Sequence, residues 1–125
     1  MAIVCSGITG YDVRVSVKAV AAEALTYGES VRISTDGLAY AVDNGKSDVC
    51  HGWVLESCAA GDMVTIVNKC RMTVDTAQTI GARAYTGATA GGSAPSTTVG
   101  TGIIVGYAWQ ANKLMLVAPV PAADG

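Results

Sequence analysis

The chain has 125 residues, a length that fits one small domain, and a net charge of −2 at neutral pH. Half of the residues are apolar and 14% are charged, which excludes a disordered chain. The eight basic residues are scattered, so we expect no nucleic-acid partner. The apolar runs reach only about five residues where a membrane span needs about 20, so we expect no membrane partner.

Small and β-branched residues dominate the composition, with 20 Ala, 16 Val, 15 Gly and 12 Thr but no Phe. Each buried CH₂ group contributes only about 0.8 kcal/mol, so a core of small side chains gains little per residue. We therefore expect a thin core that is stabilised by contact with a partner subunit or with a surface.

Alternation of apolar and polar residues predicts strands in the first half of the chain. One strand is expected over residues 11–18, and residues 30–34 and 38–42 should form a hairpin around Asp36-Gly37. A polar loop over 43–48 leads to a strand over 49–56, a turn over 59–62 and a strand over 63–67. Residues 20–25 have helix propensity, but they are too few for more than one turn.

The second half has a looser pattern. A strand with a glycine bulge is expected over 79–86, followed by a low-complexity loop over 86–101. Strands over 102–109 and 113–117 flank a turn at Asn112. Pro119 and Pro121 hold the tail extended. The pattern predicts an all-β fold.

The two halves resemble each other. Gly28 precedes Gly52 by 24 residues, and Gly81 precedes Gly106 by 25. The segments 52–55 and 106–109 match in residue type, and each leads through a turn to a short apolar strand. This spacing favours an internal duplication with repeats at 20–70 and 76–118, although chance is the alternative in a glycine-rich chain.

Residues for catalysis are scarce. His51 is the only histidine, and a strand directs it away from its neighbour Cys50 and from Asp48. We interpret His51 as an exposed or hydrogen-bonded residue, and expect no catalytic residues, no cofactor and no enzyme activity.

Four cysteines, at positions 5, 50, 58 and 70, form no CxxC pair. The potential zinc ligands Cys50, His51, Cys58 and Cys70 lack the close pairs that tetrahedral sites use, so we expect no metal site. We interpret the cysteines as free thiols, mostly buried as small hydrophobic residues. Trp53 and Trp109 would bind sugar or protein if exposed, and the favoured interpretation places both in the core.

A family resemblance rests on the order of glycine and strand blocks. The stretch AEALTYGESV at 22–31 is followed by Asp36-Gly37, Tyr40-Ala41, GWVLE at 52–56 and AAGDMVTI at 59–66. This order resembles the capsid cement, or head decoration, proteins of tailed phages. The match covers residues 12–70 well and residues 76–118 in outline.

The resemblance implies a small β-barrel-like or β-tulip fold on the outside of the virion, assembled in the host cytoplasm. Such proteins form homotrimers, sometimes dimers, and bind the major capsid protein to stabilise contacts between its subunits. They carry no catalytic residues and no cofactor.

The expected organisation is an N-terminal arm at 1–11, a β domain at 12–118 and a C-terminal tail at 119–125. Extended arms can add to the sheet edge of a neighbouring subunit. The candidate capsid or subunit contacts are Ile3, Val4, Ile8, Tyr11, Pro119 and Pro121. Two other functions stay open: a carbohydrate-binding β module using an exposed tryptophan, and a small barrel enzyme using His51.

Overall fold

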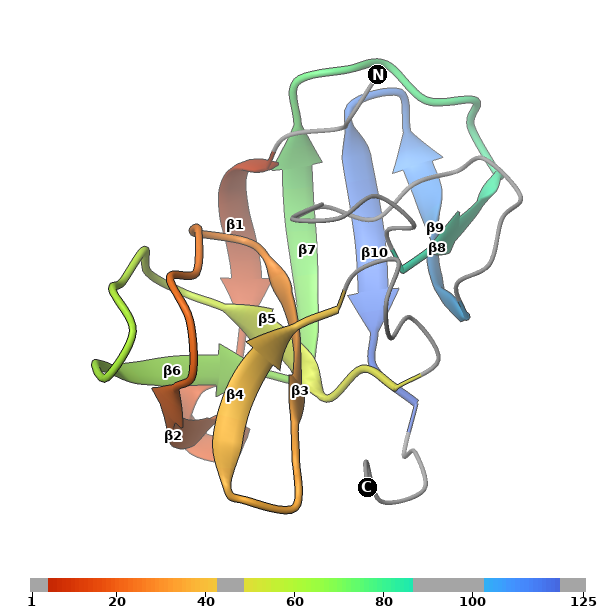
Figure 1. Ribbon diagram of the computed structural model, residues 1–125. Helices are drawn as coiled ribbons and strands as arrows, with labels where there is room; N and C mark the ends of the chain where they lie inside the picture. The colour runs from red at the N-terminus through yellow and green to blue at the C-terminus, as the bar shows by residue number, and fades with distance from the viewer. Residues whose placement is uncertain (1–4, 43–48, 87–102, 120–125) are drawn as a thin grey trace.

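A computed structural model describes residues 5–42, 49–86 and 103–119 of the chain. Strands make up the regular structure in these residues, with one turn of 3-10 helix, which confirms the all-β prediction (Figure 1). The elements are β1 Cys5–Tyr11, η1 Val13–Val15, β2 Val17–Ala21, β3 Ser30–Ile33, β4 Leu38–Ala41, β5 Gly52–Val54, β6 Met63–Val67, β7 Lys69–Val74, β8 Arg83–Tyr85, β9 Ile104–Gln110 and β10 Lys113–Val117. No helix among the described residues is long and apolar enough to cross a membrane.

The strands form two sheets. Strands β2 to β6 close into a barrel in the order β2-β4-β3-β5-β6, and the other five form an open sheet in the order β1-β7-β10-β9-β8. Pairing is antiparallel throughout, except between β2 and β4. Asn68 alone separates β6 from β7, so the chain passes directly from the barrel into the sheet (Figure 1).

The two halves of the chain share one pairing scheme. In the barrel β2 pairs with β6, β6 with β5 and β5 with β3. In the open sheet β7 pairs with β10, β10 with β9 and β9 with β8, in the same order along the chain. The strand pairing therefore follows the spacing of glycines that the sequence shows at 28, 52, 81 and 106.

Equivalent hydrogen bonds join these strands in both halves. The N–H of Gly28 donates to the carbonyl of Val54 at 2.9 Å, and the N–H of Gly81 donates to that of Ala108 at 2.7 Å. Both glycines have positive φ, 80° and 86°, a conformation that favours glycine. The last residues of β2 and β7 also donate equivalently: Ala21 to the Asp62 carbonyl and Val74 to the Asn112 carbonyl, at 2.8 and 2.9 Å.

Two clusters of buried side chains hold the fold together. The smaller one fills the barrel with alanines and valines, plus Leu25 and Ile66. The larger one lies between the barrel and the inner face of the open sheet, where Trp53 of β5 is fully buried in one cluster with Met72, Leu114 and Leu116. The barrel therefore has a small cluster of its own, and it shares the larger cluster with the open sheet.

The strand predicted over 11–18 is wrong. The chain bends there into η1, because the Asp12 carboxylate accepts a hydrogen bond from the N–H of Arg14 at 3.0 Å and the Asp12 carbonyl accepts one from the N–H of Val15 at 3.2 Å. A local side-chain bond of this kind competes with the ladder of a sheet. Val15 and Val17 are consequently 59% and 49% exposed instead of facing the core.

Three other segments differ from the predictions. Residues 20–25 form no helical turn; they complete β2 and lead to an isolated bridge between Leu25 and Cys58. The strand predicted over 49–56 is restricted to β5. The predictions also missed β7, which lies between β1 and β10 in the open sheet. The predicted loop at 43–48 lies outside the described residues, and so does the predicted loop at 86–101 apart from Thr86.

Candidate functional site

The predicted contact residues do not gather at one place. Ile3, Val4 and Pro121 lie outside the described residues. Tyr11 is 51% exposed at the end of β1, and Pro119 is exposed just beyond β10.

Ile8 packs within its own chain and does not belong to a free arm. It is half-buried in β1, pairs with Met72 of β7 and packs against the larger core cluster. Its N–H donates to the Tyr27 hydroxyl at 2.7 Å. Residues 5–11 of the expected arm are thus an edge strand of the chain's own sheet, because their pairing with β7 satisfies their backbone groups.

The outer face of the open sheet is the most distinctive surface among the described residues. Pairing places one row of residues across all five strands: Arg83, Tyr107, Met115, Arg71 and Gly10. Tyr107 is 50% exposed, and both arginines are exposed. Arg, Tyr and Met are residue types enriched at protein interfaces.

Four basic residues lie on the strands of this sheet, while its strands contain no acidic residue. They are Lys69, Arg71, Arg83 and Lys113. No ion pair joins any of them to another described residue. The outer face is therefore cationic, although the whole chain has a net charge of −2.

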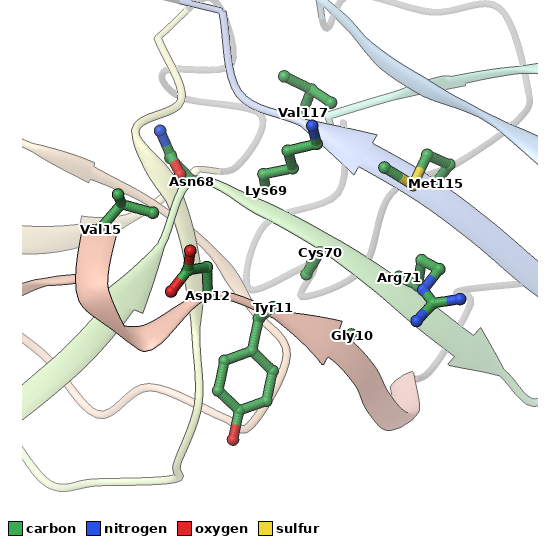
Figure 2. Close-up of a pocket in the computed structure, with 10 residues that line it drawn as sticks. All are labelled: Gly10, Tyr11, Asp12, Val15, Asn68, Lys69, Cys70, Arg71, Met115 and Val117. Atoms are coloured by element: carbon green, nitrogen blue, oxygen red, sulfur yellow. The ribbon is translucent and has the colours of Figure 1, made fainter.

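A groove of about 590 Å³ crosses this face between η1 and β10. Figure 2 shows Lys69 and Arg71 of β7 between Tyr11 and Asp12 on one side and Met115 and Val117 on the other. The lining residues are Gly10, Tyr11, Asp12, Val15, Asn68, Lys69, Cys70, Arg71, Met115 and Val117.

The floor of the groove depends on Gly10. A Cβ atom at this position would lie 2.5 Å from Nε of Arg71, so the glycine leaves room for the guanidinium above the β1 backbone. The one acid of the groove, Asp12, is 3.1 Å from Nε of Arg14, and this hydrogen bond lowers the pKa of Asp12. Its charge is therefore compensated locally, and the cations of β7 remain available to a ligand.

The two tryptophans have different environments. Trp53 is fully buried, as predicted, but Trp109 on β9 is 37% exposed, so its predicted core position is wrong. A register shift between β9 and β10 lies beside Trp109, between the pairs of Lys113 and Leu114, and such an irregularity redirects a side chain. Nζ of Lys113 lies 5.6 Å from the centre of the Trp109 ring and covers one of its faces.

The residues considered for catalysis have structural partners. Nδ1 of His51 accepts a hydrogen bond from the N–H of Ile33 at 2.9 Å. Burial raises the pKa of Cys50 and of Cys70 to about 12, so neither thiol ionises near neutral pH, where a nucleophile would need to. All four cysteines are free thiols. Within the described ranges, no three His, Cys, Asp or Glu side chains gather to hold a metal ion.

The sequence reasoning missed the cationic face because it missed β7. The segment Lys69–Val74 alternates strictly between exposed or partly exposed and buried side chains, a signal that sequence inspection can find. The row across five strands depends on pairing between distant segments, which periodicity does not specify. No protein-family model matches the chain, and no curated protein matches it in sequence.

Proposed function

We propose that this chain is a structural virion protein of the capsid cement type, without enzyme activity. It binds the outer surface of a tailed-phage head through the major capsid protein and stabilises contacts between capsid subunits. The serial order of glycine and strand blocks, which resembles that of cement proteins, supports this proposal.

The observation that carries the proposal is the outer face of the open sheet. It exposes Tyr107 and Trp109, with the partly buried Met115, beside Arg71 and Arg83, and its strands carry no acidic residue. Trp, Tyr and Arg are enriched among the few residues that contribute most of the binding energy in protein interfaces. An exposed surface of this composition on a small chain with a thin core fits a protein whose work is to bind another protein.

Co-sedimentation with phage heads assembled without this chain tests the proposal. The heads should be built from the major capsid protein of the same phage, and the chain should saturate them at a defined number of copies. Tyr107→Ala should weaken binding by about tenfold or more, as expected for a central aromatic residue. Val17→Ala, at an equally exposed position of the barrel (49% against 50%), should bind as the unchanged protein does. Absence of saturable binding would refute the proposal.

A carbohydrate-binding module is the second candidate, favoured by the exposure of Trp109. Its ring has one face covered by Lys113, which leaves less surface for stacking on a sugar. Titration with soluble oligosaccharides, followed by tryptophan fluorescence, separates the two functions. A saturable change that disappears in Trp109→Ala would favour the carbohydrate-binding function over the cement function.

A further inference from the structure

We propose that the groove along β7 holds an extended segment of the capsid protein in which two acidic side chains lie two residues apart, one at Lys69 and one at Arg71. This deepens the proposed function, on which the identity of the partner rests. Recognition of the acidic segment itself is a property of the free chain, so it can be measured without phage heads.

The two cations of the groove lie on one face of one strand. Along β7, Lys69 and Arg71 are exposed and alternate with Cys70 and Met72, which are buried. Residues two apart in a strand point to the same side and are separated by roughly 6.5 Å. An extended segment has the same repeat. Acidic side chains at alternate positions therefore reach both cations, whereas adjacent acids point to opposite sides.

Neither cation has an acidic partner in the part of the chain that the structure describes. The acid in the groove, Asp12, is bound by Arg14, because both of its carboxylate oxygens accept hydrogen bonds from the guanidinium at 3.1 Å. The exposed Asp75 follows the far end of β7, so roughly 13 Å of strand separates it from Arg71. A carboxylate from another molecule therefore meets two positive charges that no neighbouring acid compensates.

Gly10 determines where the guanidinium of Arg71 lies. The two residues face each other across the β1–β7 pair, and both line the groove (Figure 2). A Cβ atom at Gly10 would lie 2.5 Å from Nε, 2.7 Å from Nη2 and 3.0 Å from Cζ of Arg71. These three atoms belong to the guanidinium, so the planar group lies against the β1 backbone. A guanidinium held in this position loses little freedom when its N–H groups bind a carboxylate.

Apolar side chains flank the two cations, which favours a peptide segment as the occupant. Val117 pairs with Lys69, and the partly buried Met115 pairs with Arg71. Val117 is 46% exposed, and Val15 of η1, which also lines the groove, is 59% exposed. Apolar residues beside the two acids can bury surface here. The groove volume of about 590 Å³ falls in the range of about 300–1,000 Å³ that is typical of ligand sites.

Titration of the full chain with three capped peptides, followed by ¹H–¹⁵N NMR, tests the spacing. The probes are GVETEVG, whose acids are two residues apart, GVTEEVG, which has the same composition with adjacent acids, and the neutral GVQTQVG. The first should bind about threefold or more tightly than the second, because only the first places both acids on one side. The neutral probe should bind about tenfold more weakly than the first. Equal affinities for the two acidic peptides would overturn the proposal.

Two more measurements separate recognition of a segment from general attraction between charges. Raising NaCl from about 50 to about 500 mM should weaken binding of GVETEVG, because salt screens exposed charges. A thymidine trinucleotide also has two negative charges but lacks apolar side chains, so it should bind about threefold more weakly than the peptide. Binding that is indifferent to salt would overturn the proposal. Equal or tighter binding of the trinucleotide would do the same, because the face would then bind polyanions in general.

Gly10→Ala tests the geometry without changing a charge. It should displace the guanidinium of Arg71 and weaken GVETEVG binding by about threefold, with an unchanged circular dichroism spectrum. Gly7→Ala in the same strand is the matched control, because nothing lies within 4 Å of the added atom. Lys69→Gln with Arg71→Gln should abolish the preference for alternate acids, whereas Arg83→Gln, on the same face outside the groove, should retain it. The opposite result for either glutamine variant, or unchanged binding in a folded Gly10→Ala protein, would overturn the proposal.

Head binding distinguishes this proposal from the proposed function. If heads bind the unchanged chain saturably and bind Gly10→Ala and the double glutamine variant equally well, the capsid docks outside the groove. This proposal is then wrong, and the proposed function stands. If the peptides bind as described but saturable head binding is absent, the proposed function fails, and the groove remains a site for acidic segments.

Discussion

Gly106 of β9 offers the sharpest test of the packing in the open sheet. A Cβ atom built on this residue would overlap the Met115 carbonyl oxygen of β10 and come within 3.1 Å of Cα of Leu116. Both neighbours are backbone atoms in a paired strand, so neither can move aside as a flexible side chain does. Gly106→Ala should therefore force β9 and β10 apart.

The size of the effect follows from this rigidity. Adding a methyl group to a well-packed site costs about 1–3 kcal/mol, and we expect the upper end because β10 also pairs with β7. For a domain of this length, a loss of about 3 kcal/mol lowers Tm by roughly 10 °C. Small domains have only about 5–15 kcal/mol of stability, so the variant loses a large share of it.

Urea unfolding followed by tryptophan fluorescence measures this loss. Trp53 is fully buried and reports on the shared core, and a Trp109→Phe background removes the exposed fluorophore. Gly7→Ala in β1 is the matched control, because nothing lies within 4 Å of the added atom. It should change the free energy of unfolding by no more than about 0.5 kcal/mol. Equal stabilities for the Gly106 and Gly7 variants would refute the packing argument.

Three further predictions concern the core. In the folded protein at pH 8, a thiol reagent should leave Cys50 and Cys70 unmodified, and after denaturation it should react with four thiols. Rapid reaction of all four thiols in the native state would contradict the burial of Cys50 and Cys70. Burial raises the pKa of Cys50 from 9.0 to about 12, so this thiol ionises at lower pH in the unfolded chain than in the folded protein. The free energy of unfolding should therefore fall as pH rises from about 9 to about 12. In Cys50→Ala the fall should be less steep. Ile8→Ala should lower the free energy of unfolding by about 1–2 kcal/mol, since the side chain packs on the core, whereas Met63→Ala, at a 59% exposed position, should cost less than about 0.5 kcal/mol. Equal urea midpoints for these two variants would show that β1 is a dispensable arm.

The fold class and several strands could be predicted from the sequence because they depend on local patterns. The hairpin around Gly37 has its turn and both strands where alternation and Asp-Gly place them, and residues 113–117 form β10 as predicted. The spacing of Gly28, Gly52, Gly81 and Gly106 anticipates the shared pairing of the two halves. Turn preferences and side-chain alternation depend on residues only a few positions apart, so they can be recognised in the sequence alone.

Only the tertiary structure decided which segments meet. The alternating segment at 11–18 does not form one strand, because the Asp12 carboxylate bonds the N–H of Arg14 and bends the chain. Residues 5–11 form an edge strand because their backbone pairs with that of β7. The row across the open sheet joins residues up to 105 positions apart, Gly10 and Met115, and the strand order determines which side chains it brings together. Trp53 and Trp109 look alike in sequence, yet one fills the shared core and the other lies on the surface. Periodicity shows which residues of a strand share a face, but long-range pairing determines what that face contacts.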